Sequence, residues 1–358
     1  RNKSDVANMT NNGAINFNGT MANGSLRLGG YSGYVKSYFS NVTNNAPITF
    51  KEVNFSGTLT MMIGGIVSYS TKVGVYNCTN TKSGKIKIVG NSSNLYTAGI
   101  AAYSFNIDCK NTTNYGDVET EGTIVSNLMV AGMLASPGYA DSTGERYFYA
   151  DNLVNYGNVD VKMAAGSARI GGVFGRGSQG DVSNSVNHGN VTLAPNGGDL
   201  ALTIALGGFE GEGTGDGDAG TFTECVNNGI VTLDLTGCNN VTATRVAAFS
   251  GYNHHFFSKC TNNGNVVVKG TATFTTNNVL SKDDKTTDSH YNIGGLTGYK
   301  AAANGHIDES VNNGNVIFEA TVTSPEGKSP CIQIGGLVGR THQLIYDTNT
   351  QNGKIIVR

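Results

Sequence analysis

The heptapeptide NNGNVVV at residues 262–268 joins a turn signal to a strand signal. Asn and Gly favour sharp turns, whereas the valines that follow favour a β-strand. We expect the Gly to supply the positive φ of a tight corner, because it has no Cβ. Related stretches, one of them with Ala46 in place of Gly, recur at 11–17, 44–50, 83–89, 114–120, 155–161, 187–193, 227–233, 312–318 and 351–357.

A second motif, a pair of small residues inside an apolar stretch, alternates with the first along the chain. IGGLTG at 293–298 is an example, and its relatives lie at 28–33, 63–68, 98–103, 131–136, 170–175, 206–211, 246–251 and 334–339. The period between successive corners runs from 32 to 50 residues. A regular period of this size is typical of stacked repeats that bury a shared core.

The repeats predict an all-β fold, a right-handed parallel β-helix of about ten coils of 32–50 residues each. Each period is expected to hold three short strands, and alternation within 190–193 sends Val191 and Leu193 to the interior. Right-handedness follows from the crossover rule for parallel strands. The small-residue pair is expected to permit close approach of strands or to form a bulge. The repeats cover 1–358 as one solenoid domain.

Composition limits the classes of partner. The chain has 50 Gly, 38% hydrophobic and 14% charged residues. This composition is typical of strands and turns and has enough apolar content for a core. A formal charge of −2 gives no reason to expect nucleic acid as a partner. No apolar run approaches the length of a membrane span. Because the chain opens at Arg1 without Met, we expect a processed protein or a fragment, with any membrane anchor outside it.

Asn recurs at the corner of successive coils. In a stacked solenoid these side chains fall into one column, where their amides can form a hydrogen-bonded ladder along the axis. We therefore assign a structural role to the corner residues Asn155, Asn187, Asn227, Asn262 and Asn312.

The alternation of SVNNGNVIF (310–318) with IGGLVG (334–339) resembles the GLUG-type repeats of bacterial surface proteins, and looks most like large extracellular repeat proteins of Bacteroides-type bacteria. The resemblance runs from residue 11 to the end. It implies an exported β-helical protein at the cell surface or secreted, whose partner is a surface glycan, a peptide or another surface protein, such as a nutrient-uptake complex. It carries no catalytic motif and implies no activity. We expect no cofactor, apart from the Ca²⁺ considered below.

The segments after the small-residue pair are rich in aromatic residues, which would line one edge of a solenoid. Aromatic rings on a polar surface suit sugars, peptides or a protein partner, although each ring can instead cover the edge of its own coil. The candidate ligand-binding residues are Tyr139, Tyr147, Phe148, Tyr149, Tyr252, Phe256, Phe257 and Tyr299, with Tyr31, Tyr34, Tyr38, Phe39, Tyr69, Tyr103 and Phe105 in earlier coils.

Two further groups of residues have alternative interpretations. The Gly-rich acidic loop 210–224 places four carboxylates together, which predicts either a Ca²⁺ site or a solvated loop: Glu210, Glu212, Asp216 and Asp218. Four cysteines precede the corner and are expected to stack in neighbouring coils, as disulfides or as buried free thiols: Cys78 with Cys109, and Cys225 with Cys260.

These patterns favour a non-catalytic binding or scaffold module that captures a partner along the aromatic edge. One alternative is a structural spacer or assembly subunit that stacks end to end. Another is a polysaccharide lyase or hydrolase, which would need paired carboxylates in one cleft. No carboxylate recurs in adjacent coils in such a way, so the enzyme is the weaker hypothesis.

Overall fold

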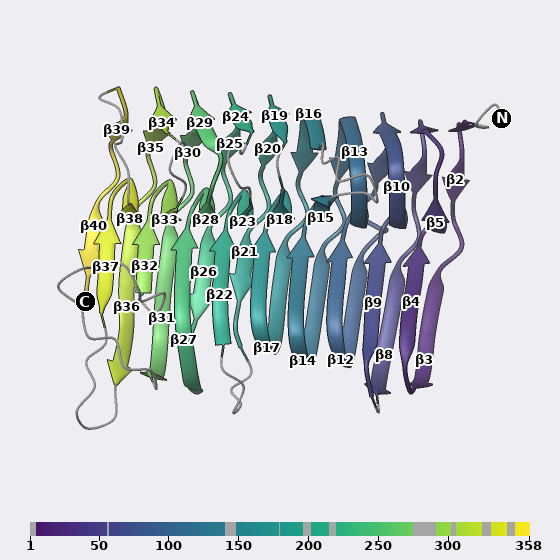
Figure 1. The fold of residues 1–358 in the computed structure, drawn as a ribbon, viewed down its shortest axis with the longest axis horizontal. Coiled ribbons are helices and arrows are strands. Elements are labelled where there is room, and N and C mark those ends of the chain that lie inside the picture. The colour runs from purple at the N-terminus through teal and green to yellow at the C-terminus, as the bar shows by residue number, and fades with distance from the viewer. Residues whose placement is uncertain are drawn as a thin grey trace.

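A computed structural model describes residues 5–55, 57–139, 148–178, 180–195, 202–214, 220–274, 291–301, 306–323, 331–341 and 348–358. Within these ranges the chain is all β, and no helix is present. Figure 1 shows an elongated stack in which successive coils follow one another along the long axis, from the purple strands near the N-terminus to the yellow strands near the C-terminus.

The strands form two sheets, which occupy the upper and lower halves of Figure 1. Sheet A contains β1 (Val6–Ala7), β2 (Thr10–Asn11), β5 (Ser32–Val35), β6 (Phe39–Ser40), β7 (Thr43–Asn44), β10 (Val67–Tyr76), β11 (Thr79–Asn80), β13 (Ala101–Asn114), β15 (Leu134–Tyr139), β16 (Phe148–Asn155), β18 (Phe174–Gly177), β19 (Asp181–Ser183), β20 (Val186–Asn187), β23 (Glu210–Gly213), β24 (Thr221–Thr223), β25 (Val226–Asn227), β28 (Ser250–Asn253), β29 (Phe256–Ser258), β30 (Thr261–Asn262), β33 (Thr297–Lys300), β34 (Ile307–Asp308), β35 (Val311–Asn312), β38 (Val338–Thr341) and β39 (Thr350–Gln351). Sheet B contains β3 (Ile15–Met21), β4 (Gly24–Gly29), β8 (Ile48–Phe55), β9 (Leu59–Gly64), β12 (Ile86–Ala98), β14 (Val118–Ala131), β17 (Val159–Gly171), β21 (Val191–Leu193), β22 (Leu202–Gly207), β26 (Val231–Asp234), β27 (Cys238–Ala247), β31 (Val266–Phe274), β32 (Tyr291–Gly294), β36 (Val316–Thr323), β37 (Ile332–Gly335) and β40 (Ile355–Val357).

Every pairing between described strands is parallel and joins one coil to the next. The strand after the corner shows this register, since Val191 pairs with Val159 on one side and with Val231 on the other. The predicted parallel β-solenoid is therefore confirmed. A coil such as 181–213 uses five short strands, β19 to β23, and not the three expected, because corners and bends divide them.

Two large apolar clusters fill most of the interior, and a small third one contains Ala98, Met129, Ala131 and Ala135. One lies along sheet B and is built from inward positions such as Val191 and Leu193, as the alternation predicted. The other lies along sheet A and contains a series of aromatic residues, among them Phe174, Phe222 and Phe257. Both clusters extend through successive coils, so each coil buries its apolar side chains against its neighbours.

The Asn ladder is present and is longer than predicted. Each rung donates a hydrogen bond from its side-chain amide nitrogen to the side-chain oxygen of the next rung, over 2.6 to 2.9 Å. The rungs are Asn11, Asn44, Asn80, Asn114, Asn155, Asn187, Asn227, Asn262, Asn312 and Gln351. These ten rungs enclose nine intervals, slightly fewer turns than the ten coils expected. All from Asn44 to Asn312 are buried.

The expected role of the corner glycine is wrong in one respect. Gly157, Gly189 and Gly229 do not have positive φ. Each lies directly over the glycine of the coil before it, so that a Cβ on Gly229 would come within 1.9 Å of the Gly189 carbonyl oxygen. Glycine is therefore required at this corner for close backbone approach and not for a left-handed turn.

The corner residue with a left-handed backbone conformation lies three positions before the Asn of the ladder. Asn152 and Asn184 hold φ of 53° and 50°, and Glu224, Lys259 and Glu309 occupy the same place in later coils with φ of 54°, 56° and 45°. Asn tolerates this region better than most residues, which accounts for its use in the earlier coils.

The small-residue pair serves close approach, as predicted. A Cβ on Gly172 would lie 2.2 Å from the Gly208 carbonyl oxygen and 2.4 Å from the side chain of Asn187. The second glycine of the pair therefore makes room for the Asn ladder. The two repeated motifs of the sequence thus meet in the folded coil.

The cysteines are free thiols. Of the two pairs that were expected to stack in neighbouring coils, only one does so. Cys225 and Cys260 occupy the same slot, two residues before the ladder, in successive coils. Cys109 lies in a different column, where it pairs with Val75, so the expectation that it stacks on Cys78 is wrong. Burial raises the pKa of the Cys78 thiol to about 11 and also raises the pKa of Cys109 and Cys225.

Candidate functional site

A stripe of Tyr and Arg side chains runs along the coils where sheet A meets sheet B across the small-residue pair. Its sheet A positions, in register order, are Tyr34, Tyr69, Tyr103 and Ser136, followed by Arg176, Glu212, Tyr252, Tyr299 and Arg340. Its sheet B positions are Arg27, Met62, Tyr96, Met129, Arg169, Ala205, Arg245, Asn292 and Gln333. We call these eighteen positions the Tyr–Arg stripe.

Contacts across the small-residue pair join the two halves of the stripe. The Arg27 guanidinium lies 4.0 Å from the centre of the Tyr69 ring, and Tyr96 meets Tyr103 edge to face at 5.2 Å. Farther along, the Arg245 guanidinium lies 4.3 Å from the centre of the Tyr252 ring. At these distances each guanidinium makes a cation–π contact with the ring.

The Tyr rings of the stripe are stacked on one another along the axis. Tyr69 and Tyr103 are nearly parallel, 4° apart with their centres separated by 5.6 Å, and Tyr252 lies 5.3 Å from Tyr299. Neighbouring coils therefore cover much of the ring faces. The sequence suggested that aromatic faces would meet a ligand, whereas the stack leaves Tyr34 44% exposed, Tyr69, Tyr103 and Tyr252 half-buried and Tyr299 buried.

The stripe is cationic although the chain as a whole is not. Five of the eight arginines in the sequence belong to it, and Glu212 is its one acidic position, which gives the stripe a formal charge of +4 against −2 for the chain. Glu212 lies between two of these arginines, 2.5 Å from Arg169 Nε and 3.2 Å from Arg176 Nε. The remaining three arginines lie toward the two ends of the stripe.

The electrostatic environment of the first Tyr residues agrees with this charge. Hydrogen bonds from Lys36 and Thr71 lower the pKa of the Tyr34 hydroxyl, and the charges of Lys36 and Arg27 act in the same direction. Burial raises the pKa of Tyr69, against the effect of Arg27. The N-terminal end of the stripe therefore presents hydroxyl groups beside cations.

The other predicted aromatic residues have different positions. Phe148 and Phe257 are 1% and 0% exposed and belong to the sheet A core, so their assignment to a ligand-binding edge is wrong. Phe256 is half-buried against His306, and Tyr149 is exposed beneath Lys110. Tyr139 ends β15, with a side chain outside the described residues, as is all of Tyr147.

Phe148 and Phe257 were misassigned because they occupy inward positions of short strands. Phe148 pairs with Ile107 and Phe257 with Ile307, so each continues an apolar column of the core. The same holds for Phe39, which is fully buried. The alternative that these rings cover their own coils is the correct one.

The predicted calcium ligands Glu210 and Glu212 are engaged with side chains of the protein itself. Glu212 pairs with two arginines, as described above, and Glu210 is fully buried. In the described residues both carboxylates face side chains of the protein itself: Glu210 lies beside His255 and Ser250, and Glu212 beside Arg169 and Arg176. The calcium site stays a prediction. Asp216 and Asp218 lie outside the described residues, and in the described part no group of His, Cys, Asp and Glu has the arrangement of a metal site.

Glu210 belongs to a buried charge cluster with Ser250, His255 and Lys300. Its carboxylate lies 3.2 Å from His255 Nε2 and accepts a hydrogen bond of 3.1 Å from Ser250 Oγ. Lys300 Nζ donates to the His255 carbonyl oxygen at 2.7 Å. Burial lowers the pKa of Lys300 to about 7, with Glu210 acting in the opposite direction.

Glycines leave room for this cluster inside the sheet A core. A Cβ on Gly177 would lie 2.3 Å from Glu210 Oε1, and one on Gly213 would lie 2.6 Å from the His255 ring. The His255 ring also stacks on Phe222, 4.5 Å between centres. Since Glu210 and His255 have no exposed surface, the cluster has no contact with solvent through which a substrate would reach it. We assign it a structural role.

The Lys300→Met variant should change the pH dependence of stability. The folded-state pKa of about 7 lies below the ordinary lysine pKa of 10.5, so the unfolded chain binds more protons between these values and wild-type stability rises with pH there. Met has similar length and does not titrate. We expect the free energy of unfolding to increase with pH by roughly 1 kcal/mol per unit more in wild type than in the variant between pH 7.5 and 8.5. Urea unfolding at several pH values measures this, and parallel curves would contradict it.

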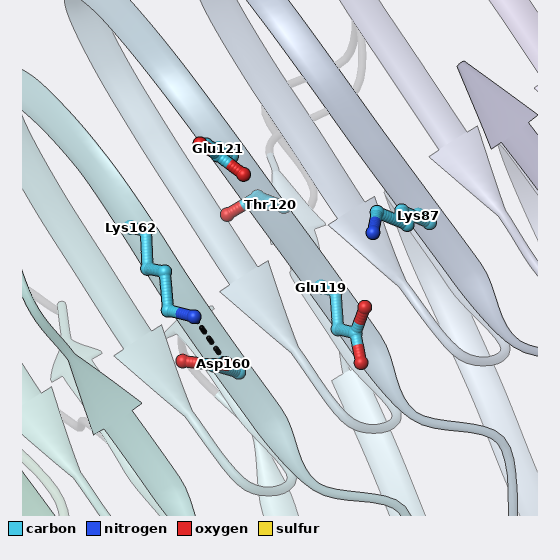
Figure 2. A pocket seen from close by; sticks show the side chains of 6 residues that line it. All are labelled: Lys87, Glu119, Thr120, Glu121, Asp160 and Lys162. Carbon is cyan, nitrogen blue, oxygen red and sulfur yellow. Dashed lines mark ion pairs between the residues drawn. The ribbon is translucent and has the colours of Figure 1, made fainter. Parts of the chain in front are cut away.

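A shallow charged pocket lies on the outer face of sheet B (Figure 2). It is lined by Lys87, Glu119, Thr120, Glu121, Asp160 and Lys162, from β12, β14 and β17. Register places Glu121 opposite Lys162, Lys162 Nζ lies 3.6 Å from Asp160, and Lys85 pairs with Glu119. The charges thus neutralise one another within β17 and between neighbouring coils, as is common on the exposed face of a sheet.

An exposed column runs beside the Asn ladder, one residue further along each corner. Tyr115, Tyr156 and His188 stack face to face, with centres 4.9 and 4.6 Å apart. The column continues in a second, outer ladder of amides formed by Asn228, Asn263, Asn313 and Asn352. These contacts link each coil to the next.

Comparison with models of known protein families, with curated proteins and with solved structures gives no match. Among the described residues, no helix has the length and apolar character needed to cross a membrane.

Proposed function

We propose that this solenoid is a non-catalytic binding module of a cell-surface or secreted protein, and that it captures a glycan chain along the Tyr–Arg stripe. The observation that carries the proposal is the stripe itself. Tyr and Arg side chains from several coils lie in one register where the two sheets meet; Arg27 and Tyr34 are exposed there, and Tyr69, Tyr103, Arg245 and Tyr252 are half-buried. Both groups donate hydrogen bonds, and sugars are rich in acceptor oxygens.

The spacing of the coils favours a glycan over an extended peptide. Successive coils are separated by roughly 4.8 Å, the distance between hydrogen-bonded strands. This is comparable to the length of one sugar residue, so a glycan lying along the axis would meet one coil per sugar. An extended peptide advances by about 3.3 Å per residue, and its side chains repeat on one face at about twice that distance. Its period does not match the coil.

We propose a non-catalytic role because of the positions of the titratable groups. Glu210 and His255 form the one buried acid–base pair described, and both are fully enclosed. Glu212, the only acid of the stripe, is held by two arginines. Neither arrangement offers the two accessible carboxylates that glycoside hydrolysis uses. Contrary to the sequence-based expectation, carboxylates do recur in neighbouring coils of sheet B, where Glu119 and Asp160 are register partners, but Glu119 pairs with Lys85 and Asp160 with Lys162.

A structural spacer is the second candidate. The observation that favours it is the unbroken inner ladder from Asn11 to Gln351, which joins every coil to the next. A stack held in this way is suited to keeping two points at a fixed separation. A spacer needs no ligand, so a binding experiment separates the two functions.

Removing stripe side chains should abolish glycan binding without unfolding the protein. We expect native gels containing amylose, xylan, polygalacturonate or alginate to retard the wild-type protein with at least one polysaccharide. The variant Arg27→Ala/Tyr69→Ala/Arg245→Ala should migrate without retardation, because it loses donors at both ends of the stripe. Circular dichroism checks that the variant is folded.

Tyr156→Ala is the matched control, since Tyr156 is 47% exposed but lies in the outer corner column and not in the stripe. It should be retarded as strongly as wild type. Equal loss of binding in this control, or failure of every polysaccharide to retard the wild-type protein, would contradict the proposed function and favour the spacer.

A further inference from the structure

We propose that the side chains of Lys300 and Asn253 react with each other to form an isopeptide bond, which links two neighbouring coils covalently. This bond is a modification that the chain makes within its own interior, and it is independent of the glycan capture proposed above. The observations that carry it are the register of the two residues, their burial and the contacts that both make with His255.

Asn253 and Lys300 are register partners in adjacent coils. They are the last residues of β28 and β33, which pair in parallel, and the Ala301 N–H donates to the Asn253 carbonyl oxygen at 3.1 Å. Register partners on parallel strands lie roughly 4.8 Å apart and direct their side chains to the same face. Asn253 is 0% exposed and Lys300 is 1% exposed. The amide and the amine are therefore enclosed together in the interior.

The backbone of His255 contacts both reacting groups. Its N–H donates a hydrogen bond of 2.7 Å to Asn253 Oδ1, and its carbonyl oxygen accepts one of 2.7 Å from Lys300 Nζ. An N–H directed at the amide oxygen stabilises the negative charge that develops there when Cγ is attacked. Among the described residues, Asn253 Nδ2 has no hydrogen-bond partner. The carbonyl group of the amide is thus polarised, while its nitrogen, which would be the leaving group, is not held by a hydrogen bond from that part of the chain.

Burial makes Lys300 a suitable nucleophile. It lowers the pKa of Lys300 to about 7, so a large fraction of the amine is neutral near neutral pH and carries the lone pair that the attack requires. The surroundings are apolar, since the buried His255 ring stacks on Phe222, which in turn stacks on Phe257. Exclusion of water also protects the new amide bond from hydrolysis.

The reaction balances without a co-reactant. The Lys300 Nζ lone pair forms a bond to Asn253 Cγ, the Cγ–Nδ2 bond breaks, and one proton from Nζ leaves with the amide nitrogen as ammonia. Glu210 is the buried carboxylate of this cluster, 3.2 Å from His255 Nε2, and its charge acts on Lys300. We assign to Glu210 the transfer of the proton from Nζ to the departing nitrogen.

The bond would reinforce the coil with the widest spacing in the inner ladder. The rungs Asn262 and Asn312 are 50 residues apart in sequence and are joined by one hydrogen bond of 2.6 Å. A covalent link from Asn253 to Lys300 ties the same two coils together, whatever the length of chain between them. Such a link also restricts the unfolded chain, as a disulfide does.

Mass spectrometry of the full chain tests the proposal. Denatured wild-type protein should be lighter than its sequence by one molecule of ammonia. Trypsin should release a branched peptide in which residues 246–259 are joined to residues 286–328, because cleavage after Lys300 is blocked. The full sequence mass, together with linear peptides 246–259 and 286–300, would overturn the inference. Loss of ammonia without the branched peptide would overturn it as well, since an Asn side chain would then have cyclised onto the backbone.

The variants Asn253→Ala and Lys300→Met should retain their full sequence masses and give no branched peptide. Lys269→Met is the matched control, because Lys269 lies in the same coil but is exposed and pairs with Asp234 at 3.3 Å. It should lose ammonia and branch as wild type does. Loss of ammonia from Lys300→Met would contradict the proposal. Since an amide nitrogen does not titrate, the pH dependence expected above for Lys300 applies to protein in which the bond has not formed.

The Glu210→Gln variant tests the transfer of the proton. Gln has nearly the same shape but cannot accept the proton, so the fraction of branched peptide in freshly purified protein should fall at least about tenfold. Circular dichroism checks that the variant is folded. Branching as complete as in wild type would overturn the role assigned to Glu210.

Discussion

Replacing Gly229 by Ala is expected to destabilise the protein by roughly 3 kcal/mol or more, or to prevent its folding. The added Cβ would lie 1.9 Å from the carbonyl oxygen and 2.8 Å from the carbonyl carbon of Gly189 in the preceding coil. Both atoms belong to the backbone, so no side-chain rotation relieves the contact. The two coils would have to separate at the corner, where the inner ladder passes.

The control for this variant occupies the same slot in the first coil. A Cβ on Gly13 would meet only the Asn11 side-chain oxygen, at an ordinary 3.6 Å. Gly13→Ala should therefore change stability little. Urea unfolding followed by circular dichroism compares the two variants, with hydrogen exchange in β21 and β26 reporting on the affected coils. Equal stability of Gly229→Ala and Gly13→Ala would show that the corner yields more easily than its geometry indicates.

Replacing Asn227 by Ala should cost roughly 2–4 kcal/mol. Asn227 accepts a hydrogen bond from Asn187 and donates to Asn262 and to the Gly229 carbonyl, at 2.9 Å in each case. The substitution leaves a buried donor on Asn187 and a buried acceptor on Asn262 without this partner. Unpaired polar groups in the interior are costly because water cannot replace the missing bond.

The next residue provides the comparison. Asn228 lies on the outer ladder, where it is exposed and accepts a bond of 2.8 Å from Asn263. Water replaces that bond in Asn228→Ala, so we expect a loss below about 1 kcal/mol. The denaturation midpoints of the two single variants show how much more the buried amide of Asn227 contributes to stability than the exposed amide of Asn228. Losses of similar size would mean that the buried ladder contributes no more than the exposed one.

The fold was predictable because the same sequence motifs recur in each repeat. The Asn corner, the strand after it and the small-residue pair occur in nearly every coil, and register pairs the equivalent residues, as for Val191 and Val231. The physical role of the corner glycine was not predictable, since a positive φ and a close backbone approach both require Gly. Only the position of Gly189 beneath Gly229 distinguishes them.

The candidate site was predictable in part. The tyrosines that follow the small-residue pair were found from their positions in the repeat, but Arg27 and Arg245, which contact Tyr69 and Tyr252, come from the strand before the pair, in the other sheet. The contact between Arg27 and Tyr69 joins residues of different coils, which no local pattern shows. The buried Glu210 was misread for the same reason. Its acidic neighbours in sequence suggested a loop, whereas its register partner Phe174 lies in the core.

Because of the inner ladder, the length of the rod does not depend on the number of residues in each coil. Successive rungs are 32 residues apart between Asn155 and Asn187 but 50 apart between Asn262 and Asn312, yet each interval spans a single amide–amide bond. Extra residues between two rungs therefore leave the axial advance unchanged. A foreign peptide inserted between Asn262 and Asn312 should not alter the distance between the ends of the rod, so this scaffold can acquire new appendages while its dimensions stay constant.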